Sequence, residues 1–209
     1  EFRTKLLNIF AVNSETKWIE AREIEERYKA IPVDKITSHP PTMVGVDLSV
    51  RDDFSTVTYN IYSPDTKSFH SVTDYYFPEG ALPGHPNREL YEGWVKAGYL
   101  KLCPGEVIDY EMIVNDILAR AKYLKILGIG YDPYKSAEFV NLLSASTGDA
   151  SDYIQPVKQT YGSFTSPIES FELALHRNRM TFDPNPITPY CFGNAVLDED
   201  RNMNNKPVQ

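Results

Sequence analysis

The sequence is poor in the features that mark several large classes of protein. It has two cysteines, Cys103 and Cys191, and they belong to no CxxC or Cys/His spacing, so neither a disulfide framework nor a zinc site is indicated. No apolar run approaches the roughly 20 residues of a membrane span, and the chain does not open with a basic and then apolar leader. We therefore expect a soluble cytoplasmic protein with no membrane association.

Basic residues are also in deficit. The 21 Lys and Arg face 29 Asp and Glu, which gives a net charge of −8. This is the wrong sign for a protein that is permanently coated on DNA, so any contact with nucleic acid has to be local, metal-assisted or enforced by a partner. A GxxxxGK[ST] phosphate loop is absent too, which argues against ATP hydrolysis by that route.

What the chain does have is enough apolar material for one compact domain. Its 209 residues are 42% hydrophobic, which suits a single core with a leading appendage. Pro32, Pro40 and Pro41 interrupt the chain before the first strand-like run. We therefore expect residues 1–41 to be a linker with a leading helix, and residues 42–209 to be the domain itself.

Hydrophobic periodicity predicts a mixed sheet with flanking helices. Three strand-like runs, 43–49, 55–63 and 68–77, indicate an antiparallel meander, with Ser63-Pro64-Asp65 as a hairpin turn. Helices are expected over 18–31, 89–97 and 137–143, after the cap residue Asp109, and from Ser166-Pro167 onward. Strands are expected over 126–131 and 153–157, with an extended piece over 99–102 and a loop over 78–86. Strand-helix alternation after a meander favours an α/β fold.

Two of the expected strands end in an acid, Asp47 and Asp132. If these strands are neighbours, both carboxylates emerge at one edge, where mutual repulsion favours the binding of a divalent cation. Mg²⁺ and Mn²⁺ take such oxygen ligands, and two ions about 4 Å apart can clamp a phosphodiester for hydrolysis. Asp132, followed by proline and a helical pattern, is equally readable as a helix N-cap.

Other polar residues carry weaker signals. Asp53 lies in a turn, where aspartate is ordinary, but it re-enters the second strand and is a candidate further ligand. Four basic residues form either a rim for phosphate contact near the acids or scattered surface charge: Lys135, Lys158, Arg177 and Arg179.

Several short polar segments follow one another in a specific order. They are Gly45-Val46-Asp47-Leu48-Ser49 with Asp53, Gly105-Glu106-Val107-Ile108-Asp109-Tyr110, Tyr131-Asp132-Pro133-Tyr134, Gln159 ahead of Ser166-Pro167, and Asn185-Pro186 followed by Asn194. In this order and spacing they resemble the nuclease half of the large terminase subunit of tailed bacteriophages. The opening Phe2 to Ile9, with Trp18-Ile19, resembles the segment that joins the ATPase motor of that family to its nuclease.

The resemblance implies a ribonuclease H-like mixed sheet, with an antiparallel meander plus parallel strands and helices on both faces. It further implies a two-metal endonuclease that cuts concatemeric double-stranded DNA in the host cytoplasm, with the terminase ATPase domain of the same polypeptide, the portal and the small terminase subunit as partners. By position, Asp47 and Asp132 correspond to metal ligands. The family usually supplies a third acid in a C-terminal helix, which would lie beyond Gln209.

Two other functions fit parts of the same pattern. Sugar kinases and actin-like ATPases also place an aspartate after a first strand, but they follow it with a glycine and a hydroxyl residue, whereas Asp47 precedes Leu48-Ser49-Val50. A non-catalytic acidic docking module that couples a packaging motor to the portal would use the carboxylates only as caps and solubilising groups. Metal-dependent stabilisation distinguishes that module from a nuclease.

Overall fold

The computed structural model describes residues 18–51, 53–148 and 152–208, so residues 1–17 of the expected linker and leading helix (1–41) lie outside the described residues. Within these ranges seven strands form one mixed sheet, in the spatial order β4-β3-β2-β1-β5-β6, with β7 also paired to β3. The strands are β1 (Pro41–Asp47), β2 (Ser55–Ser63), β3 (Ser68–Pro78), β4 (Leu100–Cys103), β5 (Lys125–Tyr131), β6 (Ile154–Pro156) and β7 (Met180–Phe182). A separate hairpin consists of β8 (Val196–Glu199) and β9 (Asn205–Val208).

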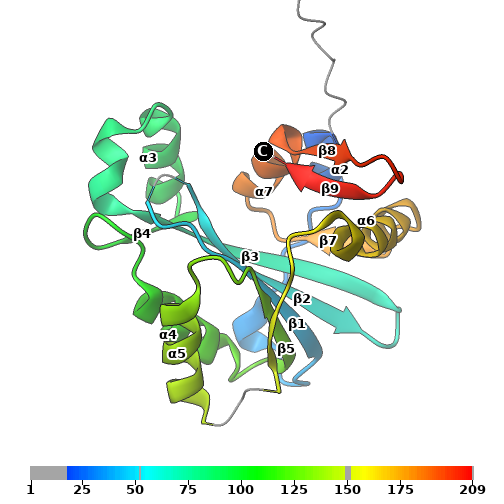
Figure 1. Cartoon of the computed structure of the whole chain (residues 1–209). Coiled ribbons are helices and arrows are strands. Elements are labelled where there is room, and N and C mark those ends of the chain that lie inside the picture. Colours follow the sequence, from blue (N-terminus) through cyan, green and yellow to red (C-terminus); the bar gives the residue numbers. More distant parts are fainter. Residues whose placement is uncertain (1–17, 52, 149–151, 209) are drawn as a thin grey trace, which may run out of the picture.

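The helices lie on both sides of this sheet (Figure 1). They are α2 (Ala21–Glu25), α3 (Arg88–Lys96), α4 (Tyr110–Arg120), α5 (Ala137–Thr147), α6 (Tyr161–His176) and α7 (Ile187–Asn194), with 3₁₀ turns η1 (Val33–Lys35) and η2 (Glu79–Gly84). Among the described residues, no helix has both the length and the apolar character that crossing a bilayer requires.

The antiparallel meander is confirmed. β1 pairs with β2 and β2 with β3, both antiparallel. Alternate residues of β2 face the core, among them Val57 and Tyr59, both fully buried, which is the period-2 pattern on which the prediction rested. The β2–β3 turn includes Lys67 in the left-handed region, at φ 51°.

The parallel half of the sheet is also confirmed, and it places β5 beside β1. Residues Val44, Gly45 and Val46 lie opposite Ile129, Gly130 and Tyr131 in a parallel register. The chain reaches β5 through α4, which begins after the predicted N-cap Asp109; the Asp109 carboxylate accepts a hydrogen bond from the Met112 backbone. β6 continues the sheet on the far side of β5, again in parallel.

Each face of the sheet has its own helices. The main core lies between one face and the α4–α5 pair, where strand residues such as Val46 meet Ile113 and Phe139. The other face carries α6, with the β8–β9 hairpin packed on that helix (Figure 1). The predicted mixed sheet with helices on both faces is therefore correct.

Three elements differ from their predictions. The leading helix covers only Ala21–Glu25, because the chain leaves it to form a bridge between Tyr28 and Phe182. The expected loop over 78–86 contains the 3₁₀ turn η2. The last long helix, α6, begins at Tyr161 rather than at Ser166, so Pro167 lies inside it.

The leading segment packs on the C-terminal part of the chain. Ile19 and Ile24 form a small core with Leu175, Met180 and Phe182. The division of the chain at residue 42 remains a prediction.

Candidate metal centre

The two strand-end acids lie side by side. Asp47 is the last residue of β1, and Asp132 directly follows β5. The parallel register sets Val46 opposite Tyr131, so the next residue on each strand emerges at the same edge of the sheet, where neighbouring strands are about 4.8 Å apart. Both residues line one open pocket of about 470 Å³.

Two glycines lie in the floor of this pocket. Gly45 and Gly130 lie opposite one another in the register, two residues before each acid and therefore on the same face of the sheet. A Cβ atom at Gly45 would meet no atom within 4 Å, whereas one at Gly130 would lie 3.0 Å from Cγ2 of Val157. The space above Gly45 is therefore open beside Asp47, whereas the side chain of Val157 already covers Gly130.

The walls of the pocket come from several elements. Thr56 and Thr58 of β2 lie on one side, and Gln159 and Phe164 come from the segment that leads into α6 and from its first turns. Thr56 is the residue directly opposite Asp47 in the β1–β2 pairing. Two hydroxyl groups and one amide group thus share the pocket with the carboxylates, beside the apolar side chains of Val157, Phe164, Ala195 and Pro207.

Burial and neighbouring negative charges raise the pKa of Asp47, the acid at the end of β1. Loss of hydration within the pocket raises the pKa of Asp47, although the residue keeps a solvent-exposed surface. The negative charges of Asp132 and Asp53 raise this pKa further, and a backbone hydrogen bond from Leu48 opposes the rise. A bound cation would relieve this repulsion, because it stabilises the ionised form of every carboxylate around it.

Asp132 is not the N-cap of the helix that follows. Its Oδ1 atom accepts a hydrogen bond from the backbone N–H of Tyr134, at 2.9 Å, whereas α5 begins at Ala137 with Ser136 as N-cap. The intervening Lys135 has φ 54°, in the left-handed region, and separates the acid from the helix. The N-cap interpretation of Asp132 is therefore wrong.

Comparison with known proteins identifies the family. A family model described as "Terminase large subunit, endonuclease domain" matches residues 1–209. The chain belongs to this terminase nuclease family. The prediction from the sequence motifs is confirmed.

Individual relatives agree with this assignment. The crystal structure of the HK97 bacteriophage large terminase superimposes with a TM-score of 0.79 at 20% identity, covering 92% of this chain and 39% of that one. The large terminase nuclease from thermophilic phage G20c with bound magnesium gives a TM-score of 0.51 at 9% identity, over 82% of this chain and 73% of that one. These likenesses support the ribonuclease H-like fold.

The curated relatives are longer proteins. The terminase large subunit of Enterobacteria phage HK97 is 23% identical over 167 residues, which are 78% of this chain and 32% of that protein. Protein YmfN of Escherichia coli (strain K12) is 28% identical over 110 residues, 52% of this chain and 23% of that protein. This terminase nuclease domain therefore spans about a quarter to a third of the curated relatives that it matches.

Asp53 lies near the pair but outside the walls of their pocket. Its Oδ1 atom accepts a hydrogen bond from Phe54 N at 2.7 Å, and its own N–H donates to Ser49 Oγ at 3.3 Å. The loop is closed by Ser55, whose fully buried hydroxyl bonds both backbone polar groups of Ser49. Across residues 18–51, 53–148 and 152–208, no three Asp, Glu, His or Cys side chains are grouped closely enough to hold a metal ion.

The four predicted basic residues do not all lie beside the acids: Lys135 is three residues from Asp132 and Lys158 stands between the pocket residues Val157 and Gln159, whereas the two arginines lie elsewhere. Lys135 and Lys158 are exposed, and Lys135 Nζ lies 5.1 Å from the ring centroid of Tyr134. Arg177 and Arg179 line a different pocket, together with the opposite end of β1 at Pro41. A role of these side chains in DNA binding remains a prediction.

No motif in the sequence marks the two threonines of the pocket as functional. Thr56 and Thr58 lie on a strand that was correctly predicted, and an antiparallel hairpin register would have placed Thr56 opposite Asp47. Gln159 was noticed only through the family resemblance, and the structure places it in the wall of the pocket.

Proposed function

We propose that Asp47 and Asp132 hold two divalent ions, Mg²⁺ or Mn²⁺, and that the domain is the DNA-cutting endonuclease of a phage packaging terminase. The observation that carries this proposal is the convergence of two carboxylates from adjacent parallel strands in one open pocket. Asp53 lies outside the pocket of the two acids, and the described residues offer no group of three such side chains for a shared ion. Its part in this proposal is therefore to act on Asp47 through its charge rather than as a third ligand.

The residues present fit such ions. Mg²⁺ is commonly bound through one or two protein carboxylates, with water and substrate phosphate as its other ligands. Asp47 and Asp132 supply that number, and the open space above Gly45 leaves room for the other ligands. The G20c terminase nuclease, whose fold this chain shares, has been crystallised with bound magnesium and with bound cobalt.

The chemistry follows from hydrolysis of a phosphodiester. Bound divalent ions supply a Lewis acid for the phosphate and lower the pKa of the attacking water. Asp47 and Asp132 fix the ions at the sheet edge, and they must be ionised to do so. Because the pKa of Asp47 is raised, protons compete for this carboxylate at higher pH than they would for an ordinary aspartate. Gln159 and Thr56, the residue opposite Asp47, offer hydrogen-bond donors to the phosphate oxygens from the pocket walls.

The wider setting is proposed from the family. The substrate is concatemeric double-stranded DNA in the host cytoplasm, and the partners are the ATPase domain of the same polypeptide, the portal and the small terminase subunit. A net charge of −8 gives the domain little intrinsic attraction for DNA. It therefore cuts the DNA that the rest of the assembly presents to it.

Plasmid nicking in the presence of Mn²⁺ tests the proposal. Asp47→Asn and Asp132→Asn should each reduce the rate by about 100-fold or more, because each removes a charged ligand. Asp65→Asn is the matched control, since Asp65 is an exposed aspartate in the β2–β3 turn, and it should cut at the wild-type rate. Full nicking by Asp47→Asn would refute the assignment.

A thermal-stability titration with MnCl2 separates the nuclease from the acidic docking module. A site that binds Mn²⁺ only in the folded state raises the Tm as the concentration increases. The rise should be lost in Asp132→Asn and kept in Asp65→Asn. No Mn²⁺-dependent shift in the wild type would favour the docking module.

A further inference from the structure

The loop between β5 and α5 carries an exposed aromatic side chain directly beside the proposed metal site. Tyr134 is 69% exposed, whereas Tyr99 and Tyr153 are 38% and 57% exposed. The Oδ1 atom of Asp132 accepts a hydrogen bond from Tyr134 N at 2.9 Å, so the backbone of this tyrosine is fixed next to the carboxylate. The ring buries little area in the folded domain and is therefore accessible to a ligand of the metal site.

Lys135 brings a positive charge to the same loop. Its Nζ atom lies 5.1 Å from the centroid of the Tyr134 ring, which is the distance of a cation–π contact. Its backbone φ is 54°, in the left-handed region that residues other than glycine rarely adopt, and such strain is concentrated at functional sites. Within the described part of the chain, the Lys135 ammonium forms no ion pair and the Tyr134 hydroxyl forms no hydrogen bond. Both groups are thus available to a substrate.

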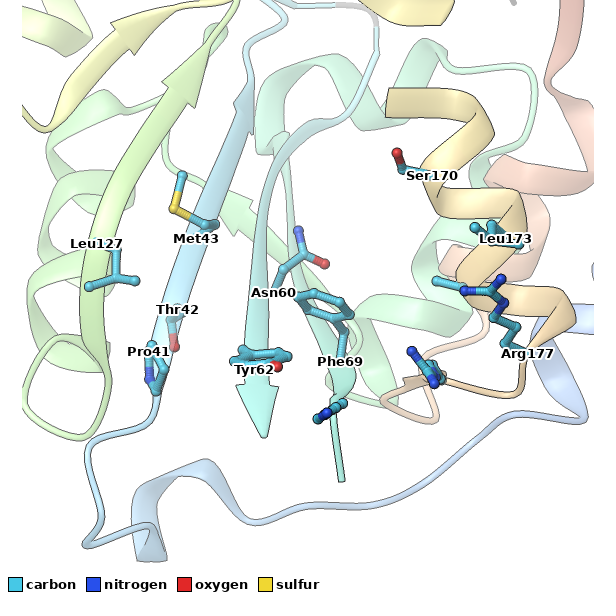
Figure 2. Close-up of a pocket in the computed structure, with 13 residues that line it drawn as sticks. Pro41, Thr42, Met43, Asn60, Tyr62, Phe69, Leu127, Ser170, Leu173 and Arg177 are labelled. Atoms are coloured by element: carbon cyan, nitrogen blue, oxygen red, sulfur yellow. The ribbon is translucent and has the colours of Figure 1, made fainter. Parts of the chain in front are cut away.

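Other cations are less well placed to meet DNA at the acids. Arg51, four residues after Asp47, is paired with Glu106 at 3.4 Å. Figure 2 shows Arg177 at the end of α6, across from Pro41 at the opposite end of β1. In a chain with a net charge of −8, the Tyr134–Lys135 loop therefore supplies an unpaired positive charge next to the acid that ends β5.

The metal site fixes where a DNA strand has to pass. When the scissile phosphate lies on ions held by Asp47 and Asp132, the neighbouring nucleotides follow at a rise of about 3.4 Å each along the strand. The loop that follows Asp132 therefore lies beside the nucleotides next to the cut. Phosphate and sugar groups are the parts of DNA that proteins contact most often, through lysine and tyrosine side chains among others.

We propose that Tyr134 and Lys135 bind the sugar–phosphate backbone of the strand that is cut. Lys135 pairs with a phosphate next to the scissile one, and the Tyr134 ring packs against the adjoining deoxyribose. This proposal rests on the proposed nuclease function, because the metal site sets where the strand lies. Every nucleotide carries these groups, so the contacts position the strand without reading its sequence. Because Tyr134 N also donates to Asp132, the strand is held in place relative to the ions.

Plasmid nicking with Mn²⁺ at several DNA concentrations tests the contact made by Tyr134. Tyr134→Ala should raise the KM for DNA by about fivefold or more and lower kcat less, because the contact exists before the bond is cut. Tyr134→Phe keeps the ring and should recover most of this loss. Tyr153→Ala is the matched control, since Tyr153 is an exposed tyrosine directly before β6, and it should leave both constants unchanged.

The salt dependence of duplex binding tests Lys135. Lys135→Asn removes the charge, while asparagine tolerates a left-handed backbone. In the Asp47→Asn background, which prevents cutting, it should weaken binding of short fluorescent duplexes equally whether they contain only A·T or only G·C pairs. It should also reduce the slope of log Kd against log salt by about one. Lys122→Asn, at an exposed lysine before the opposite end of β5, should leave the slope unchanged.

Four results would overturn the proposal. They are an unchanged KM in Tyr134→Ala, an unchanged salt slope in Lys135→Asn, a loss of binding confined to single-stranded probes, and loss of the Mn²⁺-dependent rise in Tm in Tyr134→Ala. The third would assign the ring to unpaired bases, and the fourth would make Tyr134 a support for Asp132. Full nicking by Asp47→Asn would refute the metal site, whereas the duplex-binding assay still reports on Tyr134 and Lys135, so the two failures are distinguishable.

Discussion

Asp47 and Asp132 illustrate how much a single residue can reveal when it follows a buried strand. An acid at the end of an apolar strand is costly unless it is paired, ligated or hydrated, so its presence predicts a polar site. That the two acids share a pocket follows from the pairing of β1 with β5, which the sequence patterns left as a condition and the structure shows. The role of Asp132 as a cap could not be excluded from sequence, because the start of α5 depends on the left-handed backbone of Lys135.

Asp183 shows a different effect of burial at the residue scale. Desolvation raises its pKa to about 6, although its Oδ1 atom accepts a hydrogen bond from Thr73 N at 3.3 Å and Arg120 opposes the rise. The unfolded chain titrates near about 3.9, so the folded state holds this proton more tightly. The folded state is therefore destabilised as pH rises from about 4 through about 6.

Asp183→Asn should remove this pH-dependent loss of folding stability. The amide oxygen can still accept from Thr73, so the variant should be more stable than the wild type at pH 8, by on the order of 1 kcal/mol, and equally stable at pH 4. Urea unfolding at the two pH values measures the difference, with Asp65→Asn as an exposed control that should change neither value. A variant no more stable than wild type at pH 8 would contradict this assignment of the pKa.

At the scale of elements, the strands were more predictable than the helix ends. Alternation in β2 fixes which of its residues face the core, whereas the apolar run of β5 predicts a strand without assigning its faces, and Leu127 in that run is 45% exposed. Ser166-Pro167 carries the local signature of a helix start, yet α6 begins at Tyr161 and buries Ile168 and Leu175. The turn that α6 adds before Ser166 carries Thr165, whose hydroxyl accepts a hydrogen bond from the backbone N–H of Asn205 on β9 at 3.0 Å, and this tertiary contact is not contained in the local signal.

One cap was correctly predicted and offers a direct test. The Asp109 carboxylate accepts from the backbone N–H of Met112 at 3.1 Å and so satisfies a donor in the first turn of α4. Asp109→Ala should lower the free energy of unfolding by about 1 kcal/mol, and Asp109→Ser should restore most of it.

Chemical denaturation of these variants gives the measurement. The control is Ser136→Ala, because Ser136 occupies the N-cap of α5 without a side-chain capping bond. Equal losses for Asp109→Ala and Asp109→Ser would mean that the capping bond does not stabilise α4.

At the scale of the whole molecule, the positions of surface charges in the folded protein could not be predicted from the sequence. The basic residues Arg177 and Arg179 were candidates for a rim around the acids, but the path of α6 carries them to the opposite end of β1. The position of a surface charge depends on how helices are laid across the sheet, and charge patterns along the sequence do not encode that. The same arrangement divides this face of the sheet into an acidic pocket and a basic, apolar one.

The central claim is that Asp47 and Asp132 jointly bind divalent cations, and anomalous diffraction from crystals soaked in MnCl2 tests it most directly. The account predicts Mn²⁺ peaks at inner-sphere distance, about 2 Å, from carboxylate oxygens of both residues, and loss of these peaks in Asp132→Asn. If the Asp47 pocket holds no anomalous peak at a Mn²⁺ concentration that supports DNA cleavage in solution, the account is contradicted.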